Sequence, residues 1–158
     1  MPSEKDFYQI SLKAFLKNSH GEILVLKSLK DGPFAGFYDF PGGRIHQNEF
    51  RVPLLDILKR EITEETSIVN FKIYPLPVAY ARHEVLKKEG PLHVFYLFFE
   101  GEHRGGEVKV SSEHQGYKWL DLGAIKLAQY FGPWFLEALK MYLKNSRIFG
   151  KIKKDDMK

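Results

Sequence analysis

The segment from residue 40 to residue 67, FPGGRIHQNEFRVPLLDILKREITEETS, constrains the fold of this chain more than any other. Its Pro-Gly-Gly sequence predicts a tight turn whose backbone can approach a ligand closely, because glycine tolerates positive φ. Pro53 suits the first turn of a helix, and the residues after it, LLDILKREITEET, predict a helix of about 13 residues. The segment therefore predicts a glycine turn, a loop and an amphipathic helix in succession.

Acidic side chains fall on the packing side of this predicted helix. At 100° per residue, Glu61 and Glu65 lie on one stripe, and Glu64 lies to one side of it. The same stripe carries Leu54 and Leu58. The opposite side, which we expect to face solvent, carries Asp56, Lys59, Thr63 and Thr66. Partly buried carboxylates repel one another, so the pattern favours a divalent cation such as Mg²⁺ among them, with an ion-pair network to arginines as the alternative.

Arg60 lies on a different side of the helix from this acidic stripe. There it can pair with an acid from the preceding loop, and Glu49 is the obvious partner. Such a pair would pin the loop to the helix and so hold the glycines beside the carboxylates.

The rest of the chain predicts two pairs of strands, a further strand and a second helix. In chain order these are strands at 8–18 and 22–29, strands at 71–86 and 92–102, a strand at 116–122 and a helix at 133–145 that begins at Pro133. Each pair is separated by a short turn and is expected to form a hairpin, while residues 31–43 predict a loop with room for a short strand. This order favours an α+β fold or an α/β/α sandwich with a mixed β-sheet.

The composition indicates one globular domain. The chain has 158 residues and no cysteine, which excludes disulfides and thiolate chemistry. It has no apolar run of about 18 residues and no signal-peptide pattern, so we expect a cytoplasmic protein with no membrane segment. We expect a single domain over residues 1–150 and a charged, disordered tail over residues 151–158. The net charge of +4 suits either a polyphosphate-bearing small molecule or nucleic acid, with nucleic acid less favoured.

From Gly43 onward the segment resembles the Nudix box, G-x5-E-x7-R-E-U-x-E-E-x-G-U, in which U is aliphatic. The matching positions are Gly43, Glu49, Arg60, Glu61, Ile62, Glu64, Glu65 and Ile68. The preceding FPGG is also usual in that family. There are two departures: ten residues instead of seven separate Glu49 from Arg60, and Ser67 stands where the family has glycine. That glycine ends the helix in a left-handed conformation.

The resemblance implies a Nudix-like α/β/α sandwich that hydrolyses a nucleoside diphosphate linked to another moiety. It implies that Mg²⁺ or Mn²⁺ is held by Glu61, Glu64 and Glu65, with help from the backbone carbonyl of Gly43. It also implies that one of these carboxylates positions or deprotonates the attacking water, with Glu65 and Glu61 as candidates.

A second stretch, SSEHQGYKWLDL at residues 111–122, resembles the EH-x-x-Y-x-W segment of Nudix diadenosine tetraphosphate hydrolases. The matching residues are Glu113, His114, Tyr117 and Trp119. The resemblance implies that Glu113 is a further metal ligand or the general base. Tyr117 and Trp119 alternate on a short strand, so each either packs in the core or contacts substrate.

Other side chains are candidates for substrate binding. Arg44 and Arg82 could hold phosphate oxygens, and a nucleobase could stack on an aromatic ring. The available rings are Phe37, Tyr38, Tyr80 and Tyr96. The favoured substrate is a small nucleotide, either a dinucleoside polyphosphate or a nucleoside triphosphate. An RNA 5′-end pyrophosphohydrolase and a nucleotide-binding domain without catalysis are the alternatives, and the sequence indicates no oligomeric state.

Overall fold

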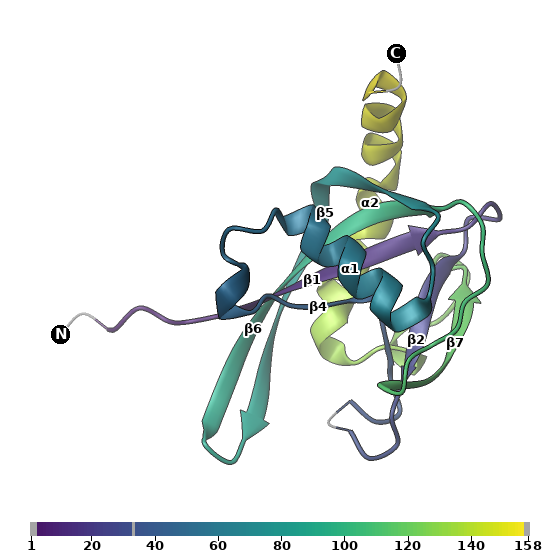
Figure 1. The fold of residues 1–158 in the computed structure, drawn as a ribbon. Coiled ribbons are helices and arrows are strands. Elements are labelled where there is room, and N and C mark those ends of the chain that lie inside the picture. Colours follow the sequence, from purple (N-terminus) through teal and green to yellow (C-terminus); the bar gives the residue numbers. More distant parts are fainter. Residues whose placement is uncertain (1–2, 33, 157–158) are drawn as a thin grey trace.

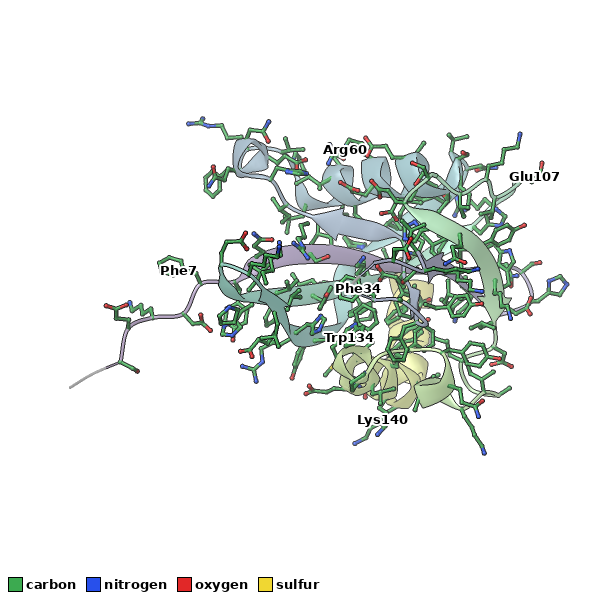
Figure 2. All side chains as sticks on the ribbon, turned by 90° about the horizontal axis from the view of Figure 1, so that it is seen from below. Phe7, Phe34, Arg60, Glu107, Trp134 and Lys140 are labelled. Carbon is green, nitrogen blue, oxygen red and sulfur yellow. The ribbon has the colours of Figure 1, made fainter. Side chains whose placement is uncertain are left out.

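In a computed structural model, a mixed seven-stranded sheet lies between two helices. The structure describes residues 3–32 and 34–156, and their side chains as far as residue 145. Figure 2 shows the three layers, with one helix above the sheet and the other below it. This is the mixed-sheet sandwich that the sequence predicts.

Figure 1 shows how the helices and strands are arranged and labels most of them. In the first half of the chain these are β1 (Gln9–Lys17), β2 (Ile23–Ser28), β3 (Tyr38–Asp39), β4 (Gly42–Arg44), the 3₁₀ turn η1 (Gln47–Glu49) and α1 (Leu54–Thr66). In the second half they are β5 (Phe71–Lys87), β6 (Gly90–His103), β7 (His114–Leu120), the 3₁₀ turn η2 (Leu127–Gln129) and α2 (Pro133–Asp156). Neither helix in the described part of the chain has the length and apolar character that a membrane crossing requires.

The two faces of the sheet carry separate apolar cores. Successive residues of a strand point to opposite faces, so Leu12, Ala14 and Leu16 of β1 face α1, whereas Phe15 faces α2. The core beneath α1 is mainly aliphatic, with Phe99 among its members, and the core beneath α2 is built largely from aromatic rings. The core on the α1 side positions the acidic stripe, and the aromatic core forms the floor of a pocket.

The two strands of the first expected hairpin separate directly after the turn that joins them. β1 and β2 pair only through Lys17 and Ile23, next to the turn. Beyond that pair, residues 38–44 lie between the two strands, with β3 pairing to β2 and β4 pairing to β1. We call residues 38–44 the wedge segment. The predicted hairpin is therefore confirmed only beside the turn, because farther along the strands the wedge segment takes the backbone hydrogen bonds that β1 and β2 would have exchanged.

The second hairpin is present as predicted, with β5 antiparallel to β6, and β6 lies parallel to β1. β7 pairs with β2 along its whole length, which confirms the short strand. α2 begins at Pro133 as expected but continues to Asp156, past the predicted end at residue 145. The backbone of residues 151–156, which we expected to be a disordered tail, is therefore helical here. Residues 157–158 lie outside the described residues, and the division into domain and tail stays a prediction.

α1 has the predicted length and ends at Ser67, which has a φ of 63° and a ψ of 7°. Among the described residues other than glycine, Ser67 alone has a positive φ. Its N–H donates to Thr63 O at 2.9 Å and its Oγ donates to Lys109 O at 3.0 Å. The left-handed position usual for glycine is thus kept with serine, and the hydroxyl gains a partner.

Two residues of α1 differ from the helical-wheel prediction. Leu54, expected to pack, is 45% exposed because it is the first helical residue and lines an open groove with Pro75 and Pro77. Thr66, expected to face solvent, is fully buried. Its Oγ1 donates to Ile62 O at 2.6 Å, and its carbonyl oxygen accepts the N–H of Lys109 at 2.9 Å. The polar atoms of Thr66 are therefore satisfied without water.

Candidate active site

Glu65 is the most buried carboxylate of α1, with 7% of its surface exposed. Its Oε2 accepts a hydrogen bond from the backbone N–H of Gly42 at 3.1 Å. Burial raises the pKa of Glu65 to about 8, although the charge of Lys13 and the Gly42 N–H act in the opposite direction. In the metal-free protein, burial therefore favours the protonated form of this carboxyl group.

Glu61 lies one turn before Glu65 and close to the second glycine of the turn. Burial raises its pKa, Arg60 lowers it, and the negative charges of Glu64 and Glu113 raise it further. A Cβ atom at Gly43 would lie 2.7 Å from Glu61 Oε2, so only glycine leaves room for this carboxylate. The acidic stripe and the glycine turn thus meet face to face.

Arg60 and Glu49 form the expected ion pair, with 2.8 Å between Nη2 and Oε2. The same Nη2 lies 3.1 Å from Glu61 Oε1. Glu49 also accepts a hydrogen bond from the backbone N–H of His46, which holds η1 in place. The extra residues before α1 turn outward, and Phe50 is 91% exposed, so they do not separate the pair.

The donor set fits a divalent cation by its chemistry. In the described part of the chain no three His, Asp or Glu side chains are arranged as a ready metal site, and Glu64 turns toward Arg60 at 3.9 Å. However, Glu61 and Glu65 both have raised pKa values because they are buried near other acids. Carboxylate oxygens beside an open glycine backbone are ligands that Mg²⁺ and Mn²⁺ accept.

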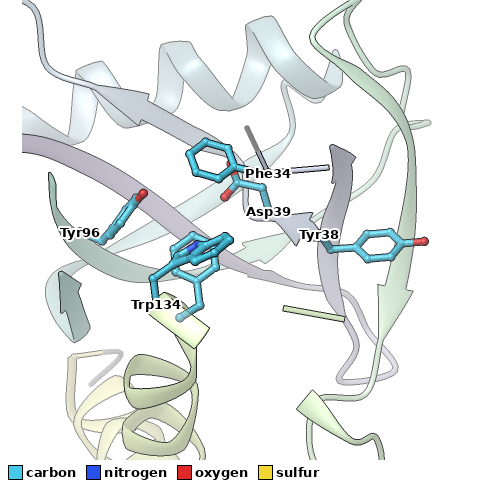
Figure 3. Close-up of a pocket in the computed structure, with 6 residues that line it drawn as sticks. Phe34, Tyr38, Asp39, Tyr96 and Trp134 are labelled. Atoms are coloured by element: carbon cyan, nitrogen blue, oxygen red, sulfur yellow. The ribbon is translucent and has the colours of Figure 1, made fainter. Parts of the chain in front are cut away.

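A pocket opens on the other face of the sheet, between the wedge segment, β6 and the start of α2 (Figure 3). It is narrow, with free space of about 10 Å³, which is room for about one water molecule, and it is lined by Phe34, Tyr38, Asp39, Tyr96, Trp134 and Phe135. We call it the aromatic pocket. Beside it, the ring of His83 stacks on that of Trp134, with 4.3 Å between the ring centroids. Burial lowers the pKa of this histidine. Asp39 supplies the carboxylate of a pocket that is otherwise aromatic.

The sequence matches the NUDIX domain over residues 8–140. The chain belongs to the NUDIX domain family. No curated protein is similar enough in sequence to count as a match.

Solved structures of other NUDIX proteins have the same fold. The chain is similar to the MutT protein of Methanosarcina mazei Go1, with 26% identity, a TM-score of 0.68 and coverage of 92% of this chain and 97% of that one. It is also similar to a Caenorhabditis elegans Ap4A hydrolase in a binary complex, with 23% identity, a TM-score of 0.61 and coverage of 90% and 98%. A third similar structure is the NUDIX domain of Shewanella oneidensis NrtR complexed with ADP ribose, with 14% identity, a TM-score of 0.62 and coverage of 89% and 90%.

The three residues of this NUDIX chain expected to bind substrate lie on three different strands, β4, β5 and β7. Arg44 follows the glycines on β4, and its charge helps to lower the pKa of His83, so it lies near the aromatic pocket. Arg82 lies on β5 in a groove with Tyr8, whose hydroxyl accepts its hydrogen bond at 3.4 Å. Tyr117 is 41% exposed. It pairs across the sheet with Leu26, which packs in the core beneath α1. Arg44 and Arg82 thus line neighbouring grooves that both include Tyr8, whereas Tyr117 lies on the α1 side of the sheet.

The segment that resembles the diadenosine tetraphosphate hydrolases lies beside the NUDIX carboxylates. Glu113 is exposed and close enough to raise the pKa of Glu61. Burial lowers the pKa of His114, and its Nδ1 is buried with no hydrogen-bond partner in the described part of the chain. Trp119 packs against the core beneath α1, so the core alternative holds for Trp119 but not for Tyr117.

Four residues near this NUDIX site were not predicted: Lys13, Phe34, Asp39 and Trp134. Lys13 could have been noticed in the sequence, because a lysine among the apolar residues of a buried strand is unusual. Phe34 and Trp134 carried none, since their proximity depends on how the loop after β2 meets α2.

Alanine at the two glycines is expected to have different effects. Gly42 has a φ of 139°, and a Cβ there would overlap the carbonyl of Leu12, so Gly42→Ala should destabilise the fold by roughly 3 kcal/mol. At Gly43 the clash is with the mobile end of Glu61, so Gly43→Ala should stay folded and lose activity by roughly a hundredfold. Urea denaturation and nucleotide hydrolysis would measure the two effects. Equal loss of stability in both variants would contradict this assignment.

Proposed function

We propose that this NUDIX chain is a metal-dependent hydrolase that cleaves the pyrophosphate linkage of a nucleoside diphosphate joined to another moiety. The observation that carries the proposal is the meeting of Glu61 and Glu65 with the glycine turn, on the buried side of α1. Burial raises the pKa of both carboxyl groups, nearby acids raise it further, and a cation bound between them removes the penalty.

Mg²⁺ or Mn²⁺ would be held by Glu61, Glu64 and Glu65, with the backbone carbonyl of Gly43. When bound, it neutralises the pyrophosphate charge and lowers the pKa of a bound water. Two contacts within the protein hold the proposed ligands in place. The Arg60–Glu49 pair holds the loop before α1 against the helix, and the Gly42 N–H fixes the carboxylate of Glu65.

Proton transfer from the attacking water requires a carboxylate near the ligand set. Glu113 suits this role because it lies on the segment just before β7, near Glu61, and is open to solvent. Glu61 and Glu65 are the other candidates, as the sequence implies. A general base of this kind contributes roughly 10²–10⁴-fold to the rate.

The residues around the aromatic pocket favour a nucleobase as part of the substrate by their chemistry, and their rings must move apart to admit one because the pocket is narrow. Its rings offer stacking surfaces, and the Asp39 carboxylate offers acceptors for N–H groups of a base. Two similar structures contain or are named for nucleotide ligands, ADP ribose and Ap4A. Within the nucleotides, we favour a dinucleoside polyphosphate such as diadenosine tetraphosphate or a nucleoside triphosphate.

A panel of nucleotides with Mg²⁺, with products separated by chromatography, would test this proposal. The panel should contain dinucleoside polyphosphates, nucleoside triphosphates, nucleotide sugars, ADP-ribose and 5′-triphosphorylated RNA. Hydrolysis of a member at a P–O–P linkage is expected, and reaction in ¹⁸O-labelled water identifies the phosphorus attacked. No metal-dependent hydrolysis of any member would contradict the proposal.

A nucleotide-binding domain without hydrolysis is the second candidate, because Arg60 already neutralises part of the acidic stripe. Its guanidinium contacts Glu49 and Glu61 together and lies near Glu64. Titration with Mn²⁺, followed by water-proton relaxation, distinguishes the two. Nucleotide binding without any Mn²⁺ binding favours the second candidate, whereas Mn²⁺ binding that is lost in Glu61→Gln favours the hydrolase.

Replacement of Tyr117 by alanine should affect substrate binding and leave the fold intact. The ring is exposed, so the free energy of unfolding should change by less than about 0.5 kcal/mol. If the ring stacks on a base, KM should rise by roughly tenfold while kcat changes little. Steady-state kinetics and thermal denaturation measure both quantities. An unchanged KM would remove Tyr117 from the substrate site.

A further inference from the structure

Lys13 is a buried lysine on β1, with 8% of its side chain exposed. Its Nζ lies 3.0 Å from Asp39 Oδ2 and donates to the carbonyl oxygen of Phe40 at 3.3 Å. A lysine is seldom buried unless its charge is paired, because the loss of hydration is costly. Both of its partners belong to the wedge segment, so Lys13 holds this segment from the neighbouring strand.

The wedge segment connects the aromatic pocket to Glu65 within a few residues. Asp39 lines the pocket, and three residues later the N–H of Gly42 donates to Glu65 Oε2. Between them, the carbonyl of Pro41 accepts the N–H of Ala14. A small shift of Asp39 is therefore transmitted along a short, tightly bonded backbone to the Gly42 N–H.

We propose that Lys13 is a positioning residue that couples the aromatic pocket to Glu65 through the wedge segment. Its ammonium group fixes the Asp39 carboxylate at the pocket and the Phe40 carbonyl behind it, and so sets the position of the Gly42 N–H. The chemistry assigned to the pocket and to Glu65 rests on the proposed function, whereas the coupling rests on the contacts alone.

The first test follows the Gly42 amide by NMR in the metal-free protein. Lys13→Met removes the charge and keeps the length of the side chain, so the Gly42 resonance should move upfield and its hydrogen exchange should speed up by roughly tenfold or more. Lys13→Arg should restore most of the protection, because a guanidinium can reach both acceptors. Lys27→Met, which removes an exposed lysine from β2, is the matched control and should change neither.

A second variant covers the case in which Lys13→Met fails to fold. The double variant Lys13→Met, Asp39→Asn removes both charges, so no unpaired ion is left in the interior. We expect it to fold and still to show the exposed Gly42 amide. A Gly42 amide that is as protected in either folded variant as in the wild type would overturn the proposal.

The second test uses kinetics with two substrates, the preferred nucleotide and inorganic tripolyphosphate, which has no base. Asp39→Asn keeps an oxygen that can accept from Lys13, so it should raise KM for the nucleotide alone, by about tenfold, whereas Lys13→Met should also lower kcat for both substrates. A loss due only to unfolding would reduce the activity on both substrates equally and leave KM unchanged. An identical effect of the two substitutions on both substrates would also overturn the coupling.

The two tests separate this inference from the proposed function. If the wild type hydrolyses no nucleotide but the Gly42 amide responds to Lys13→Met, the proposed function fails and the positioning role stands. If hydrolysis is found and the amide does not respond, the positioning role fails and the proposed function stands.

Discussion

Glu64→Gln and Glu65→Gln are each expected to lower metal-dependent turnover by roughly 10²–10⁴-fold while the protein stays folded. Both glutamates belong to the α1 set that would hold the ion, and glutamine is a similar shape without the charge. Glu65→Gln retains an oxygen that can accept the Gly42 N–H, so the wedge segment should keep its place. Glu64 is exposed, so its replacement should not disturb packing.

The measurement is initial rates over a range of Mg²⁺ concentrations, together with circular dichroism of each variant. Glu89→Gln serves as the control, because it removes the same charge from the turn between β5 and β6, away from α1. The control should retain full activity. Near-wild-type turnover in both α1 variants would disprove the assignment of the metal site.

Without metal, Glu65→Gln should be more stable than the wild type at pH 8, even though it is inactive. The pKa of Glu65 is about 8 in the folded protein, against an ordinary value of 4.5. Between these pH values the folded protein keeps a proton that the unfolded chain has released, so the stability of the wild type falls as pH rises. Glutamine has no charge to bury and avoids this fall.

The size of the effect follows from the shift in pKa. Each unit of raised pKa corresponds to about 1.4 kcal/mol, so the variant should gain roughly 4 kcal/mol at and above pH 8 and almost nothing near pH 4.5. Urea denaturation of both proteins with EDTA, from pH 4.5 to pH 9, measures the difference, in which groups common to both proteins cancel.

Addition of Mg²⁺ should reverse the order, because an ion that binds only the folded wild type adds to its stability. A difference in stability that does not vary with pH would show that Glu65 is ionised in the metal-free protein. That outcome would neither support nor exclude a metal site. It would show that burial of Glu65 is not the reason for one.

The sequence predicted the parts of the site that depend on nearby residues. The periodicity of α1 placed Glu61 and Glu65 on the buried side, and the facing acid for Arg60 was Glu49. Helical spacing fixes the relation of Glu61 to Glu65 within α1, whereas the pairing of Arg60 with Glu49 was inferred from the side of the helix on which Arg60 lies. The sequence did not decide whether Ser67 takes the left-handed position of the usual glycine or the helix ends differently, and the structure shows the left-handed conformation.

The parts that the sequence did not predict depend on contacts between distant residues. Lys13 and Asp39 are 26 positions apart, and the aromatic pocket joins residues from the loop after β2, from β6 and from α2. The wedge segment was missed for the same reason, since a short turn between two β-rich runs favours a hairpin. Local pattern gives no information on whether a third strand enters between them.

The narrow contact between β1 and β2 also affects how local opening spreads through the molecule. The backbone ladder crosses from one strand to the other at a single residue pair, beside the turn at residues 18–22. β2, β3 and β7 therefore form one bonded group, and β1, β4, β5 and β6 form another. We expect these two groups to behave as separate cooperative units, so that fluctuations of one are only weakly passed to the other. The wedge segment, which belongs to both, is then the part of the backbone most sensitive to their relative movement.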